Sequence, residues 1–115
     1  MDMKYMLLLH EQDTDWTSVP QDELDKALSA HGEFVQYLTK RGRPFSGEAL
    51  RPSYTATTLR PKGDGVLVTD GPYVELKEHI GGFYVIEADT LDEAIEVAKR
   101  APMGSGTEIR PIWDA

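Results

Sequence analysis

One stretch of the chain decides its fold: Asp70-Gly71-Pro72-Tyr73-Val74-Glu75-Leu76-Lys77-Glu78-His79-Ile80-Gly81-Gly82-Phe83. It begins with turn chemistry, because an Asp side chain can bond the backbone ahead of it, Gly tolerates positive φ and Pro fixes φ. It ends in a Gly pair that leads into an apolar strand, and such glycines indicate that another group approaches the backbone closely. The stretch therefore predicts a tight turn that delivers the chain into a central strand.

Four polar side chains lie between the turn and the Gly pair: Glu75, Lys77, Glu78 and His79. One interpretation is a solvated hairpin corner in which these charges form surface ion pairs. The other is a site that performs proton or charge chemistry. The residue types alone fit both interpretations.

The composition limits the classes of function. A chain of 115 residues is expected to form a single domain, here 1–115, and the absence of Cys excludes disulfides, thiolate metal sites and a Cys nucleophile. The net charge of −8 disfavours nucleic acids and anionic membranes as partners. The three His residues form no paired ligand motif, so we expect neither a metal nor another cofactor. The apolar run 5–9 is too short for a signal peptide or a membrane span, which favours a cytoplasmic protein.

Hydrophobic periodicity and turn signals give the order of the elements. A strand apolar on both faces is predicted at 3–10, and a helix should run from Gln21 to about Arg41, with a capping box at 18–21 and Gly42 as its stop. The remaining predictions are a weak strand at 44–50, a hairpin of 54–60 and 66–69, a strand at 82–88, a helix from 91 with a capping box at 90–93, and a last strand at 107–113.

This order is the split βαβ pattern of a ferredoxin-like α+β fold, with the hairpin as an insertion. Two helices cover only one face of such a sheet. Because the strands at 3–10 and 82–88 are apolar on both faces, the second face should also be buried. We therefore expect a homodimer in which two sheets pack face to face.

His31 is the one histidine predicted to face inward, because it lies three residues after Leu28 and four before Val35 in the apolar stripe. A structural histidine at the edge of the core is one interpretation, and a functional group is the other. Gly32 weakens the helix next to it, which suggests that something packs closely against the backbone there.

Most of the chain resembles the DGPF-domain family, part of the YCII-related superfamily. The resemblance is carried by Asp70-Gly71-Pro72-Tyr73, Glu75, Lys77-Glu78, Ile80-Gly81-Gly82-Phe83, Leu91-Asp92-Glu93-Ala94 and Glu108-Ile109-Arg110-Pro111, and it extends through Lys4-Tyr5-Met6, Ala30-His31-Gly32, Gly47-Glu48 and Thr57-Thr58-Leu59. It implies a dimeric ferredoxin-like α/β barrel. The family is mostly uncharacterised, and some members are encoded beside extracytoplasmic-function sigma factors.

The wider YCII-related group is proposed to use a His on the first helix and a later Asp as a catalytic pair. His31 matches that His, but the usual Asp-Pro reads Ala101-Pro102 here, so Asp70 is the substitute that we expect. A carboxylate bonded to one nitrogen of an imidazole fixes its tautomer and supports acid–base chemistry. The resemblance thus favours a lyase-, isomerase- or dehalogenase-like reaction on a small molecule, with His31 as the base and Asp70 orienting it.

Three further side chains, Tyr73, Glu75 and Lys77, are predicted to line the mouth of this pocket and contact the substrate. A non-enzymatic module that binds a small molecule or a protein, linked to sigma-factor regulation, is the alternative. A purely structural dimer is the third possibility. The sequence leaves the choice open.

Overall fold

The computed structural model describes residues 3–113, which form six strands, two α-helices and one short 3₁₀ turn. In chain order these are β1 (Met3–Gln12), α1 (Gln21–Arg41), β2 (Phe45–Ala49), η1 (Ser53–Thr55), β3 (Thr57–Lys62), β4 (Gly65–Asp70), β5 (Glu78–Ala88), α2 (Leu91–Ala98) and β6 (Gly106–Pro111). The predicted elements are all present in the predicted order.

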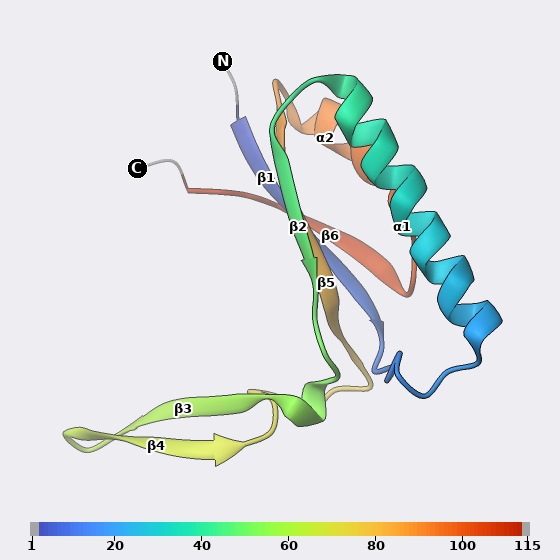
Figure 1. Ribbon diagram of the computed structural model, residues 1–115. Helices are drawn as coiled ribbons and strands as arrows, with labels where there is room; N and C mark the ends of the chain where they lie inside the picture. The colour runs from blue at the N-terminus through green and yellow to red at the C-terminus, as the bar shows by residue number, and fades with distance from the viewer. Residues whose placement is uncertain (1–2, 114–115) are drawn as a thin grey trace.

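The main sheet has the strand order β2-β5-β1-β6, and every pair of neighbours is antiparallel. Both helices lie on the same side of this sheet (Figure 1). The predicted α+β class is confirmed, and the strand order is compatible with a ferredoxin-like fold.

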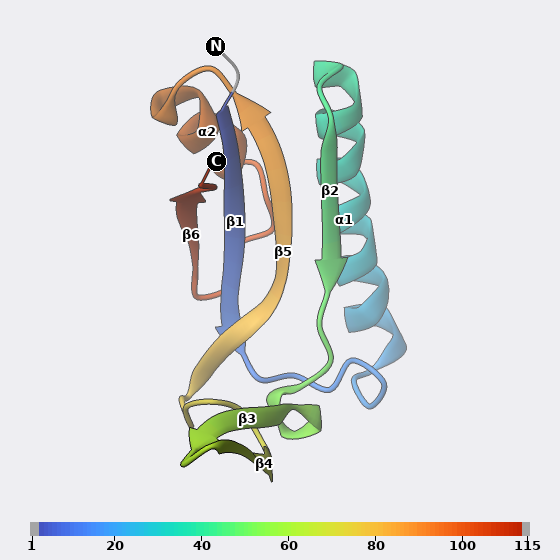
Figure 2. The ribbon, with the colours of Figure 1, turned by 90° about the vertical axis from the view of Figure 1, so that its left-hand side faces the viewer.

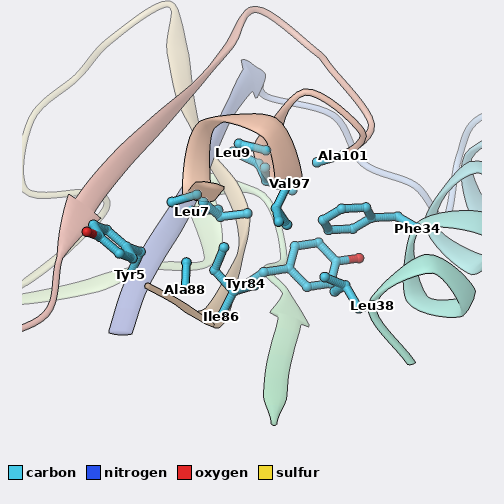
Figure 3. Packing of buried hydrophobic residues seen from close by; sticks show 12 residues of the cluster. Tyr5, Leu7, Leu9, Phe34, Leu38, Tyr84, Ile86, Ala88, Val97 and Ala101 are labelled. Carbon is cyan, nitrogen blue, oxygen red and sulfur yellow. The ribbon is translucent and has the colours of Figure 1, made fainter. Parts of the chain in front are cut away.

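The core lies between the helices and one face of the sheet. Tyr5 and Leu7 of β1 pair with Ile86 and Tyr84 of β5, so all four side chains point to the helical side. The largest fully buried side chains are Tyr5, Phe34, Leu7, Leu38, Ile86 and Val97 (Figure 3). Burying a side chain of this kind stabilises the fold by roughly 1.5–3 kcal/mol, so this layer fixes α1 on the sheet.

The other face of the sheet is also apolar at its centre. Met6 pairs with Val85 and Leu8 with Phe83, and these four side chains are half-buried. Among residues 3–113 no helix covers this face, which is turned toward the viewer in Figure 2. The predicted apolar character of both faces is therefore confirmed, whereas a second copy that covers this face stays a prediction.

The two helices differ in how they begin. The capping box predicted at 18–21 is wrong: the N-cap of α1 is Pro20, which makes no side-chain cap bond, and the Ser18 hydroxyl donates to the carbonyl of Asp15 instead. The capping box at 90–93 has the predicted cap bond, because the amide of Glu93 donates to Oγ1 of Thr90 at 3.1 Å. Gly42 ends α1 at a φ of 73°, as predicted.

Strands β3 and β4 form a separate two-stranded ribbon, here called the arm, which extends away from the helices (Figures 1 and 2). Its apolar side chains Leu59, Val66 and Val68 are exposed. The predicted turn follows it: Gly71 has a φ of 104°, and its amide donates to the carbonyl of Ala56 at 2.8 Å. This turn directs the chain from the arm back toward β5.

Candidate functional site

A pocket of about 400 Å³ lies between α1 and the helical face of the sheet. Its lining comes from β1, α1, β2, β5 and the loop before α1: Leu9, Glu11, Trp16, Leu24, Ala27, Leu28, His31, Val35, Phe45, Gly47, Glu48, Ala49, Gly81, Gly82 and Tyr84. Most of these side chains are apolar. Three polar groups stand out among them and are described in turn: His31, Tyr84 and Glu11.

His31 projects from α1 into this pocket, as its place in the apolar stripe predicts. Its Nδ1 is 2.8 Å from the hydroxyl oxygen of Tyr84, and the two rings stack with their centroids 6.0 Å apart. Burial lowers the pKa of His31 from its ordinary value of 6.5, because desolvation disfavours the imidazolium ion. The ring is therefore mainly neutral at pH 7 and can accept a proton.

Tyr84 reaches His31 because its neighbour on β2 is a glycine. Gly47 pairs with Tyr84, and a Cβ at Gly47 would lie 2.5 Å from Cδ1 of the tyrosine ring. On its other side the ring meets Phe34 edge-on, with centroids 4.8 Å apart. Burial raises the pKa of the Tyr84 hydroxyl, so this group remains a phenol that can donate a hydrogen bond.

Glu11 lies near the end of β1, beyond an irregularity in the pairing with β5 between Leu9 and His10. Its side chain lies over Gly81, where a Cβ would come 2.0 Å from its Oε1. Burial raises the pKa of Glu11 above 4.5, and this effect outweighs a smaller lowering by the nearby indole of Trp16. Glu11 is thus a half-buried carboxylate that is costly to ionise.

The predicted close approach at the Gly pair is confirmed. Besides Glu11 over Gly81, the carbonyl oxygen of Glu48 would lie 2.9 Å from a Cβ at Gly82. The Gly pair was therefore the sequence signal for Glu11, although it did not identify the partner. Neither Tyr84 nor Trp16 was singled out from the sequence.

The loop that carries Trp16 is tied to the 3₁₀ turn at the base of the arm. Asp13 accepts hydrogen bonds from the amide of Ser53, at 2.8 Å, and from its hydroxyl. Asp15 accepts one from the Tyr54 hydroxyl at 3.1 Å. The two bonds from Ser53 lower the pKa of Asp13. The pKa of Asp15 is lowered most by hydrogen bonds from the Thr17 hydroxyl and amide, and the bond from Tyr54 adds to them.

The structure does not bring the other predicted site residues to His31. Asp70 ends β4 in the arm and is not part of the pocket lining, and Nδ1 of His31 is bonded to Tyr84 instead. The guanidinium carbon of Arg60 lies over the ring of Tyr73, 4.9 Å from the centroid of that ring. Exposed Glu75 and Lys77 also lie outside the lining. The chemical roles of these residues stay predictions.

The expected packing at Gly32 is wrong, since nothing lies within 4 Å of a Cβ placed there. Among residues 3–113 no three His, Cys, Asp or Glu side chains gather as a metal site would require. Within the same range, no helix has the length and apolar character needed to cross a membrane.

The comparisons with known proteins give a family rather than an activity. The model of the YCII-related domain matches residues 3–115. An uncharacterised protein of Rhizobium meliloti (strain 1021) is 27% identical over 114 residues, which covers 96% of this chain and 92% of that protein. By this match the chain belongs to the YCII-related family.

Proposed function

We propose that this protein binds a small molecule in the pocket between α1 and the sheet, and that His31 performs acid–base chemistry on it. The observation that carries the proposal is an imidazole in a mostly apolar pocket, with one nitrogen 2.8 Å from the hydroxyl oxygen of Tyr84. Among residues 3–113 no hydrogen bond occupies Nε2 of His31. That nitrogen is therefore available to a ligand.

The bond to Tyr84 takes the orienting role that the sequence assigned to a carboxylate. When Nδ1–H donates to the phenol oxygen, Nε2 carries the lone pair and acts as the base. The chemistry that fits is removal of a proton beside a carbonyl group, which begins isomerisation, elimination or dehalogenation. The proposal assigns this chemistry to His31 and Tyr84 and does not use Asp70.

The test is proton exchange. Cyclohexanone in D₂O exchanges the protons beside its carbonyl, and ¹H NMR follows the rate. We expect the wild type to accelerate exchange, and His31→Gln to remove the acceleration while the protein stays folded. His10→Gln is the matched control, because His10 bonds Glu108 and lies outside the pocket. Equal exchange in the wild type and His31→Gln would overturn the acid–base role.

A non-enzymatic binding module is the second candidate, proposed as a small-molecule or protein sensor linked to sigma-factor regulation. The observation in its favour is that His31 is hydrogen-bonded to a phenol. A carboxylate would activate the imidazole more strongly than a phenol does. Cyclohexanone that shifts the His31 ring resonances without any accelerated exchange would favour this candidate.

We also propose a homodimer built on the open face of the sheet, as in a dimeric α/β barrel. Half-buried Met6, Leu8, Phe83 and Val85 support it, because a contiguous apolar patch of this kind favours a partner. Sedimentation should give a dimer at micromolar concentration, and Leu8→Glu should dissociate it. Leu28→Glu, on the other side of the sheet, is the control. A stable wild-type monomer would disprove the dimer.

A further inference from the structure

We infer that the ligand of this pocket is a compact amine that carries the carbonyl group of the proposed chemistry on a small hydrocarbon body, bound as an ammonium ion whose N–H groups donate to Glu11. The inference rests on the proposed small-molecule function and adds its ligand class. It starts from the carboxylate of Glu11, which the proposed acid–base chemistry of His31 does not use.

Glu11 lacks a cationic partner among the residues that the structure describes. No ion pair joins its carboxylate to a Lys, Arg or His within residues 3–113, and the lining of the pocket includes no Lys or Arg. A half-buried carboxylate without a counter-ion is unfavourable, which agrees with its raised pKa. A cation brought by the ligand would remove this penalty.

The carboxylate lies at the pocket because residue 81 has no side chain. A Cβ at Gly81 would come 2.0 Å from Oε1 of Glu11, so the glycine leaves the space in which the Glu11 side chain lies. A charged hydrogen bond is stronger than a neutral one. The glycine therefore leaves a carboxylate acceptor in the pocket wall.

The walls beside Glu11 suit the rest of such a ligand. Trp16 offers an aromatic face, and an ammonium ion is attracted to such a face. The α1 wall is hydrocarbon from Leu24, Ala27 and Leu28, and the Leu28 side chain remains 61% exposed. An amine with a small hydrocarbon body would cover this surface.

Anions are disfavoured at the same place. The chain has a net charge of −8, and the acidic residues of the lining are Glu11 and Glu48. The backbone carbonyl oxygen of Glu48 lies beside Gly82, whereas Glu48 as a residue is exposed. The proposal therefore does not use the carboxylate of Glu48 as the acceptor. The electrostatic field therefore favours cations over carboxylates or phosphates.

Three probes of equal shape test the inference: cyclohexylamine, cyclohexanol and cyclohexanecarboxylate. Binding is measured at pH 7 by Trp16 fluorescence in a Trp113→Phe background, because Trp113 is 90% exposed and lies outside the pocket. We expect the amine to bind about tenfold more tightly than the alcohol, and the carboxylate more weakly than both.

Glu11→Gln keeps the size of the side chain and one oxygen acceptor, and removes the charge. It should reduce the affinity for the amine to that for the alcohol and leave the alcohol unchanged. Glu48→Gln is the matched control and should preserve the preference. Equal binding of amine and alcohol to the wild type would overturn the inference, as would a preference that survives in Glu11→Gln.

The proposed function fails in a different way. It fails if none of the probes changes Trp16 fluorescence at millimolar concentration and the wild type and His31→Gln exchange cyclohexanone protons at the same rate. This outcome overturns both proposals. If cyclohexanol binds and His31 accelerates exchange while the amine has no advantage, the ligand class alone is wrong.

Discussion

The hydroxyl oxygen of Tyr84 lies 2.8 Å from Nδ1 of His31, so one hydrogen bond joins the centre of β5 to the middle of α1. The tyrosine ring belongs to the buried core, whereas its hydroxyl faces the pocket. The same residue thus links the stability of the fold with the chemistry of the candidate site.

Tyr84→Phe separates these two roles. The phenylalanine ring keeps the packing on Phe34, so we expect a loss of only about 1 kcal/mol, the typical value for one hydrogen bond. The ¹⁵N shifts of the His31 ring should change, because the variant removes the hydrogen bond that selects the tautomer of the ring. Tyr5→Phe is the control, since the Tyr5 hydroxyl donates to the Met3 sulfur at 3.5 Å and not to His31. Unchanged His31 shifts in Tyr84→Phe would contradict the bond.

The pH dependence of stability should report the burial of His31. Its pKa is lowered in the folded protein, so the unfolded chain binds more protons between that pKa and the ordinary value of 6.5. Stability is therefore full above about pH 6.5 and decreases as the pH falls through this window. Urea unfolding at a series of pH values should show that His31→Gln lacks this part of the decrease. An identical pH profile in the variant would argue against a buried neutral imidazole.

Replacement by alanine should have different effects at two glycines of the pocket. Gly81→Ala places a Cβ against the flexible Glu11 side chain, which can move away, so the stability should change by less than about 1 kcal/mol while the preference for cyclohexylamine is lost. Gly47→Ala places a Cβ 2.5 Å from the Tyr84 ring and 2.9 Å from the Phe83 carbonyl. It should cost about 1–3 kcal/mol. Urea unfolding and Trp16 fluorescence measure the two effects, and a destabilised Gly81→Ala with intact amine preference would refute this assignment.

Removing the N-cap side chain of α2 should lower the stability of the protein without changing the pocket. Thr90→Ala removes the acceptor for the amide of Glu93 and should destabilise the protein by about 1 kcal/mol. Thr90→Ser should restore most of it, because the hydroxyl remains. Both variants should bind cyclohexanol like the wild type. A loss of binding in Thr90→Ala would mean that α2 contributes to the pocket.

The sequence predicted the fold well because its signals are local. Short runs that are apolar on both faces mark β1 and β5, and Gly42 and Thr90 mark helix ends through chemistry that neighbouring residues complete. The failure at Ser18 has a local cause too: Pro20 takes the N-cap position with a φ of −56° and extended backbone, which leaves Ser18 in the preceding turn.

The site was predicted only in part, because its contacts are long-range. His31 could be found from its place in the apolar stripe. Tyr84 and Glu11 could not, since their positions depend on the β2–β5 register at Gly47 and on the irregularity after Leu9 in the β1–β5 pair. Asp70 was predicted as the partner of His31 because it belongs to the Asp-Gly-Pro motif. A sequence motif does not give the distance between the arm and α1.

The amide of Ser53 donates to Asp13 and the hydroxyl of Tyr54 donates to Asp15, so the loop that carries Trp16 is joined to the 3₁₀ turn before the arm. Neither Ser53 nor Tyr54 belongs to the pocket lining, although Trp16 does. One wall of the pocket therefore rests on residues about forty positions further along the chain.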